Sequence, residues 1–149
     1  MKKMPPIEKI PEAYSAIIDN RVDLKENIAL VKSSDLKKVY TIKWQDNTYY
    51  SNDNSTYWQN YPGYPVIAVL MLQNKLSYNE EIATYFKSIN WHELNANNKR
   101  DYTKSLNDIL SNVTEDKINI INSEINKVYQ ELSNLDLTLT KKQNLLLAF

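Results

Sequence analysis

Apolar and polar residues alternate along three short segments in the first half of the chain. Each segment is rich in β-branched and aromatic residues, and turn-forming Ser-Asp and Asp-Asn pairs separate them. The pattern therefore predicts a small antiparallel β-meander with strands over residues 28–33, 38–44 and 48–51. Tyr40, Ile42 and Trp44 share one face of the middle strand, and we expect this face to lie on the core.

Helical periodicity dominates the rest of the chain. Pro11 and Glu12 suit the first turn of a helix over residues 11–18, because an acid there faces the positive end of the helix dipole. Residues 65–76, PVIAVLMLQNKL, are almost entirely apolar, so we expect a helix that is buried on most sides. Further helices are predicted after a capping Ser77, over residues 93–111, and after a capping Thr114.

The last of these helices carries the most regular pattern in the sequence. Its apolar residues recur at alternating spacings of three and four, which is typical of a heptad seam. Two interpretations follow: the seam packs on its own domain, or it forms an intermolecular coiled coil or a partner-binding face. The heptad seam consists of Ile118, Ile121, Ile125, Val128, Leu132, Leu135 and Leu139.

Together these elements predict an α+β fold. We expect a small antiparallel β-meander followed by a helical half that ends in a long heptad-patterned helix. The sequence assigns an α+β core to residues 1–113 and a C-terminal helix with a docking tail to residues 114–149. A chain of 149 residues is long enough for one domain with a substantial core.

Composition narrows the functional classes. The chain has 18 basic and 18 acidic residues, so it lacks the basic excess that is typical of proteins that bind duplex DNA. It has no cysteine and one histidine, His92, which argues against a metal cluster and against a Ser-His or Cys-His catalytic pair. Neither a Walker loop nor a nucleophile elbow is present. We therefore expect a protein that is not an enzyme and that uses no metal or cofactor.

The sequence also predicts a cytoplasmic protein. The opening residues, MKKMPPIEKIPEA, contain lysines but lack the apolar segment of a signal peptide. No apolar run reaches the roughly 18 to 20 residues that a membrane-spanning helix needs. We expect no association with a membrane.

Aromatic residues concentrate between residues 49 and 65, YYSNDNSTYWQNYPGYP, around Gly63, the only glycine of the chain. One interpretation places these rings in the core, where large side chains stabilise a small domain. The other is a stacking surface, because exposed aromatic rings stack on the bases of single-stranded DNA. The candidate stacking residues are Tyr50, Trp58 and Tyr61.

The order of elements around this segment resembles the SWIM-type zinc finger. That family has two strands, a Cys-x-Cys pair, a variable loop, a Cys-x-His pair and a helix. The resemblance covers roughly residues 28–72, where Ser51 and Asp53 stand in the first pair and Val66 and Ala68 in the second. All four positions depart from the zinc ligands, so the resemblance implies a metal-free module that the packed aromatic rings stabilise instead. SWIM-type proteins bind DNA or proteins beside recombinases and helicases, which implies a similar setting here.

The C-terminal residues KKQNLLLAF resemble the PCNA-interacting peptide. In that family a glutamine, an aliphatic residue and an aromatic residue follow one another at fixed spacing, and here Gln143, Leu146 and Phe149 match. The second aromatic residue of the family pattern is missing. The resemblance implies docking on a sliding clamp, whereas the alternative is that the tail forms the last turns of the preceding helix.

These observations lead to two expectations for function. The first is a non-catalytic accessory or adaptor protein of DNA replication, recombination or repair, which docks on a sliding clamp or a recombinase-like partner and contacts single-stranded DNA. The second is an oligomeric structural or regulatory protein, viral or from a mobile element, with no role in nucleic-acid binding. Self-association through the heptad seam is compatible with both.

Overall fold

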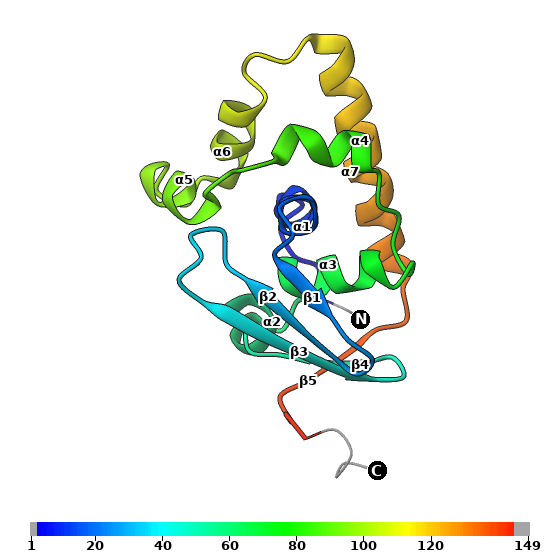
Figure 1. Cartoon of the computed structure of the whole chain (residues 1–149). Helices are drawn as coiled ribbons and strands as arrows, with labels where there is room; N and C mark the ends of the chain where they lie inside the picture. Colours follow the sequence, from blue (N-terminus) through cyan, green and yellow to red (C-terminus); the bar gives the residue numbers. More distant parts are fainter. Residues whose placement is uncertain (1–2, 145–149) are drawn as a thin grey trace.

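The computed structural model describes residues 3–144, which combine a five-stranded sheet with a set of helices (Figure 1). This arrangement confirms the predicted α+β class. The elements are α1 (Lys9–Ile18), β1 (Val22–Leu24), β2 (Ile28–Lys32), β3 (Val39–Gln45), β4 (Thr48–Ser51), α2 (Asn54–Gln59), α3 (Tyr64–Leu72), α4 (Glu80–Ala83), the 3₁₀-helix η1 (Thr84–Phe86), α5 (Trp91–Asn97), α6 (Tyr102–Ile109), α7 (Glu115–Asn134) and β5 (Thr138–Thr140).

The sheet has the strand order β1-β2-β3-β4-β5, and its first four strands form an antiparallel meander. The three predicted strands are confirmed as β2, β3 and β4. The sequence pattern missed β1 and β5, which are only three residues long. β5 pairs with β4 in parallel, with Tyr50 opposite Thr140, so the C-terminal part of the chain completes the edge of an N-terminal sheet.

Helix α3 is the apolar helix that the sequence predicted. Residues 65–71 are all buried, since the helix packs against α1 on one side and against the sheet on the other. The helix ends at Leu72, four residues earlier than expected. Asn74 adopts a left-handed conformation with φ 61°, which stops the helix, and Leu76 is buried beyond that turn.

Helix α1 lies at the centre of the molecule. In Figure 1 it is seen end-on between α3 and α4, with α7 along one flank and α5 and α6 along the other. Ile10, Ala13 and Tyr14 are fully buried there. Ser15 ties α1 to the helical half, because its hydroxyl donates to the carbonyl of Phe86 and accepts from the indole of Trp91 at 2.8 Å.

Two predictions about the helical half are wrong in detail. Asn79 caps α4 by accepting from the Ile82 amide at 3.0 Å, whereas Ser77 donates its amide and hydroxyl to Glu131 of α7. Residues 93–111 form two helices, α5 and α6, rather than one. Lys99 and Arg100 have positive φ angles of 54° and 65°, and this turn separates the two helices.

Helix α7 begins after Thr114, as predicted, but the Thr114 side chain makes no capping hydrogen bond. The helix places most of the heptad seam in the core. Ile121, Ile125, Val128 and Leu132 are at most 3% exposed and pack within their own chain. The seam does not continue as a helix beyond Asn134, however, because the backbone becomes extended at Leu135. Leu139 lies in β5, so the expectation that the tail continues the helical register is wrong for the described residues.

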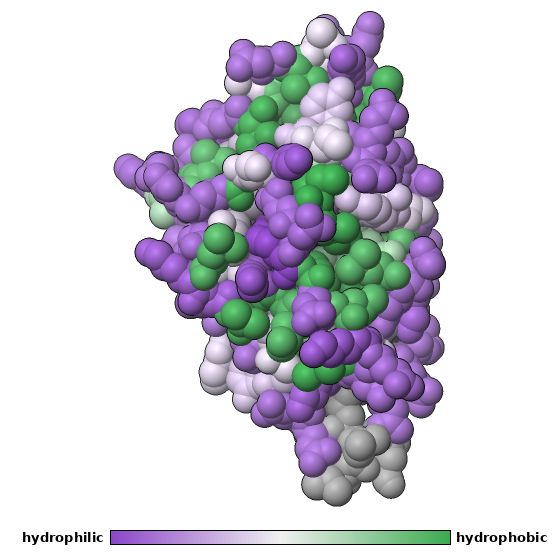
Figure 2. All heavy atoms as spheres, viewed as in Figure 1, coloured by the Kyte–Doolittle hydropathy of each residue, from purple (hydrophilic) through white to green (hydrophobic). Residues whose placement is uncertain are grey.

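The surface combines hydrophilic and hydrophobic residues. On the face drawn in Figure 2, hydrophobic residues gather in a central region that a hydrophilic rim surrounds. The same view places α1, α3 and the edge strand β1 there, and Leu24 of β1 is 39% exposed. Within residues 3–144, no helix has both the length and the hydropathy to cross a membrane.

Candidate functional site

The aromatic segment folds into a short helix, α2, that is fixed at both ends. Asp53 caps its N-terminus by accepting from the Thr56 amide at 3.1 Å, and the Ser51 hydroxyl donates to the same carboxylate. Asn60 ends the helix in a left-handed conformation with φ 61°. The Thr56 hydroxyl accepts from the Gly63 amide at 3.0 Å, so the start of α3 is bonded to α2.

The buried carboxylate of Asp53 is the centre of this arrangement. Asp53 is only 5% exposed, and burial raises the pKa of its side chain above the usual value, while the hydrogen bonds from Ser51 and Thr56 oppose the shift. A Cβ at position 63 would lie 2.2 Å from Asp53 Oδ2. The glycine is therefore required because the carboxylate occupies the space in which any other side chain would begin.

Helix α2 carries a pair of aromatic rings, of which Tyr57 is half-buried and Trp58 is exposed. Trp58 is 65% exposed, and the Tyr57 ring lies against it edge to face with 4.8 Å between the centroids. Tyr57 in turn contacts Tyr50 of β4, with 6.5 Å between the ring centroids. Tyr50 is 7% exposed and anchors the pair to the sheet.

Lys141 completes this group of rings with a positive charge. Its Nζ atom lies 5.4 Å from the ring centroids of both Tyr57 and Trp58, within the range of a cation–π interaction. The position follows from β5, since Lys141 directly succeeds Thr140, the residue opposite Tyr50. We name Tyr50, Tyr57, Trp58 and Lys141 the Trp58 surface.

Two further lysines lie beside the Trp58 surface. Lys43 stands opposite Tyr50 in the register of β3 and β4, so both side chains project from the same face of the sheet. Lys3 lies 5.5 Å from the ring centroid of Tyr61 and donates to the carbonyl of Gln59 at 2.9 Å. Positive charge therefore flanks the rings, although the chain as a whole has a formal net charge of zero.

The structure brings together only part of the stacking set that the sequence suggested. Trp58 is exposed, Tyr50 is buried beneath its neighbours, and Tyr61 is half-buried under Lys3. Sequence reasoning missed Tyr57 and Lys141 as members of the surface. Tyr57 adjoins Trp58 in the sequence, and this proximity was the available signal, whereas the approach of Lys141 depends on a strand pairing over about 90 residues that has no local pattern.

The four positions of the SWIM resemblance have other roles in the structure. Ser51 and Asp53 cap α2, as described above, and both are buried. Val66 and Ala68 are fully buried in α3. In the part of the chain that the structure describes, no group of three or more His, Cys, Asp or Glu residues is arranged to hold a metal ion.

A second polar cluster lies between α1 and α5. Glu12 is 4% exposed, Lys9 Nζ lies 3.6 Å from its carboxylate, and Asn95 donates to it at 3.4 Å. Burial raises the pKa of Glu12, and the positive charge of Lys9 opposes the shift. Because these contacts join two helices, the cluster holds the fold together.

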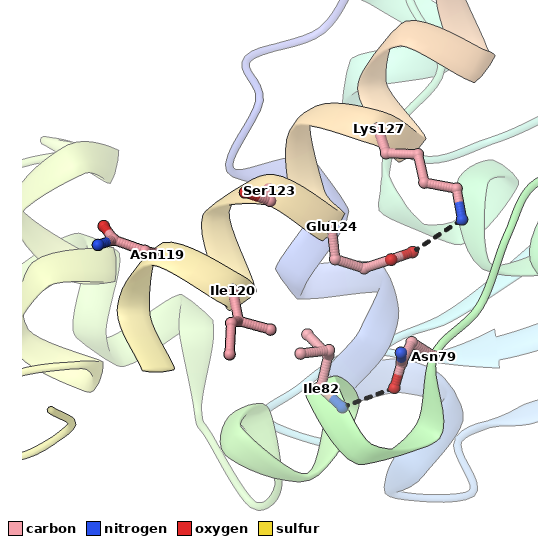
Figure 3. Close-up of a pocket in the computed structure, with 7 residues that line it drawn as sticks. All are labelled: Asn79, Ile82, Asn119, Ile120, Ser123, Glu124 and Lys127. Atoms are coloured by element: carbon pink, nitrogen blue, oxygen red, sulfur yellow. Dashed lines mark hydrogen bonds and ion pairs between the residues drawn. The ribbon is translucent and has the colours of Figure 1, made fainter. Parts of the chain in front are cut away.

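A shallow groove of about 420 Å³ runs between α4 and α7, and Figure 3 shows the side chains that line it. Ile82 and Ile120 point toward each other across it, and Ile120 is 61% exposed. Asn79 caps α4, and Lys127 pairs with Glu124 at 3.8 Å. The two facing isoleucines make part of the groove apolar.

The candidate docking tail lies only partly within the described residues. Gln143 is exposed, two residues after Lys141. Leu146 and Phe149 lie outside the described residues.

The fold and the Trp58 surface define an α+β protein with an aromatic surface that lysines flank. Comparison with protein-family models matches residues 2–138 to the family described as Uncharacterised conserved protein UCP014422, and the chain belongs to this family. No curated protein and no solved structure was found to match the chain.

Proposed function

We propose that this protein is a non-catalytic accessory protein of DNA replication, recombination or repair, which acts in the cytoplasm by holding partners. The observation that carries the proposal is the exposed Trp58, braced by Tyr57 and flanked by Lys141. Covering a large apolar ring that is exposed to water lowers the free energy, so the ring favours binding of a partner. Tryptophan and tyrosine are accordingly enriched at binding surfaces.

The proposed protein partner is a sliding clamp or a recombinase-like protein, which docks on Gln143, Leu146 and Phe149. Lys141 supports this proposal, because it leads directly from the Trp58 surface into the candidate tail.

We further propose that the module over residues 28–72 derives from a SWIM-type zinc finger that has lost its metal. Ser51 ends the last strand of the meander, Asp53 follows it, and Val66 and Ala68 lie in helix α3, which is the order of the zinc-binding pairs in that family. A hydrogen-bonded cap and a buried helix supply the stabilisation here. This origin is compatible with a role beside recombinases or helicases.

A pull-down with purified sliding clamp tests the partner. The double variant Leu146→Ala and Phe149→Ala is expected to lose clamp binding with an unchanged melting temperature, because the docking contacts lie in the tail. Lys117→Ala, on an exposed position of α7, is the control and should bind as the wild type. Absence of binding by the wild type, or equal binding by the double variant, would contradict clamp docking.

A second candidate function is an oligomeric structural or regulatory protein without a role in nucleic-acid binding. The exposed Ile120 at the groove between α4 and α7 favours this candidate, because an apolar side chain there is available to another copy. Light scattering on the purified protein separates the two candidates. A concentration-dependent dimer that Ile120→Asp dissociates would support the second, and a monomer at all concentrations would exclude it.

A further inference from the structure

We infer that single-stranded DNA binds the Trp58 surface, with one base stacked on Trp58 and the adjacent phosphate next to Lys141. The inference rests on the proposed function and names the ligand of the same surface. It combines two observations: an exposed ring held in a fixed orientation, and lysine side chains beside it.

The ring is prepared for stacking. Trp58 is 65% exposed, so part of its ring is open to a planar group, beside the Lys141 ammonium that lies 5.4 Å from its centroid. The edge-to-face contact with Tyr57 at 79° and the Tyr57–Tyr50 contact at 83° fix its orientation from the sheet outward. Bases stack on such rings without regard to sequence, because every base has a π face.

The charges match a phosphate backbone. Lys141 lies 5.4 Å from the Trp58 ring, and Lys43 projects on the sheet face beside Tyr50. Lys3 adds a positive charge near Gln59, the residue after Trp58. The carboxylate in this segment, Asp53, is buried and directed at the N-terminus of α2, so its charge is turned away from a ligand at the ring.

Single-stranded DNA fits these features better than duplex DNA does. In a duplex the base faces are covered by their neighbours, so Trp58 has no face to stack on. Duplex binding also relies on many phosphate contacts, and a chain with a formal net charge of zero offers few of them. A local cluster of lysines beside an exposed ring suits a short single strand.

Fluorescence anisotropy with labelled oligo-dT tests the stacking contact. Trp58→Ala is expected to weaken binding by about 5-fold to 100-fold, the loss that corresponds to removing one base–aromatic stack. Trp58→Phe keeps a ring and should retain most of the affinity. Leu36→Ala, which removes a comparably exposed apolar side chain between β2 and β3, is the matched control and should bind as the wild type.

The salt dependence of binding tests the phosphate contact. Lys141→Ala should reduce the slope of log K against log salt by about 0.7, since each neutralised phosphate of a single strand contributes about that amount. Lys117→Ala, on α7, should leave the slope unchanged. An unchanged slope for Lys141→Ala would show that Lys141 does not contact a phosphate of the bound strand.

The outcomes separate this inference from the proposed function. Three results would overturn the inference. They are no binding of oligo-dT, equal binding by Trp58→Ala and the wild type, and binding of oligo-dT that is no tighter than binding of a duplex of the same length. If the clamp still binds in that case, the accessory role stands and the Trp58 surface belongs to a protein partner. If oligo-dT binds and the clamp does not, the inference stands and the partner proposal fails.

Discussion

Gly63 shows how one residue couples two elements. Its backbone angles, φ −78° and ψ 173°, are open to other residues, so conformational freedom does not explain it. The glycine is explained by lack of space, because the Asp53 carboxylate that caps α2 occupies the position of a Cβ atom at residue 63. Without that close approach, α2 and the aromatic rings on it would not sit against the start of α3.

Replacing Gly63 with alanine is expected to destabilise the protein by about 2 kcal/mol. The new methyl group would displace Asp53 from the cap of α2, and losing a cap costs about 1 kcal/mol, with overpacking adding to it. Urea denaturation measures the change. Asn60→Gly is the control, since glycine tolerates the left-handed conformation there and should leave stability within about 1 kcal/mol of the wild type. Equal stability of Gly63→Ala and wild type would contradict the close approach.

The buried carboxyl group of Glu12 should make the stability of the protein depend on pH. Burial raises the pKa of its carboxyl above the ordinary value of 4.5. Between 4.5 and the raised pKa, the folded state holds more protons than the unfolded state, so the free energy of unfolding falls as pH rises through this window.

Substituting Glu12 with glutamine should remove this contribution. The variant is expected to gain stability relative to the wild type as pH rises from about 4.5 to 7, because the buried charge is gone. Urea titrations of both proteins at several pH values measure the difference. A difference that stays constant across this range would show that Glu12 does not titrate with a raised pKa.

At the scale of the element, α7 decides between the two interpretations of the heptad seam. Two adjacent isoleucines differ in burial: Ile121 is fully buried in the core, whereas Ile120 is 61% exposed beside the groove between α4 and α7. The seam packs on its own domain along the helix, and the pattern of threes and fours that predicted a seam is correct as far as Leu132.

The two isoleucines form a matched pair of variants. Ile121→Ala should destabilise the protein by about 2–5 kcal/mol through the cavity it leaves, whereas Ile120→Ala should change stability by about 0.5 kcal/mol or less. Thermal denaturation and light scattering together check this. Equal effects on stability, or a change of molecular mass with Ile121→Ala, would instead support an intermolecular seam.

At the scale of the whole molecule, segments far apart in the sequence share one core and one sheet. The core contains buried residues from α1, the sheet, α3 and α7, so both of the segments divided at residue 113 contribute to it. β5 then returns to the sheet and pairs with β4, and the Thr138 amide donates to the carbonyl of Asn47 at 2.9 Å. This return places Lys141 over the rings of α2.

Ending the chain after Leu137 should expose the edge of β4. The truncated protein is expected to show faster hydrogen exchange in β4 and more self-association, because unpaired strand edges bind other chains. A chain that ends after Lys142 keeps β5 and is the control. Unchanged exchange in β4 after the shorter truncation would show that β5 does not protect this edge.

The sequence by itself determined the type of most elements, because apolar spacing is a local property that burial on one face requires. It predicted three strands of the meander, the buried α3 and the start of α7. The break between α5 and α6 escaped it, since the left-handed Lys99 and Arg100 carry no strong local turn signal.

Only the tertiary structure decided which residues form the Trp58 surface. Ring exposure depends on what packs above each ring, and so Tyr50 is buried while Trp58 is exposed. The approach of Lys141 depends on the parallel register of two short strands far apart in the sequence. That register is set by the packing of the whole core, and no local pattern of residues encodes it.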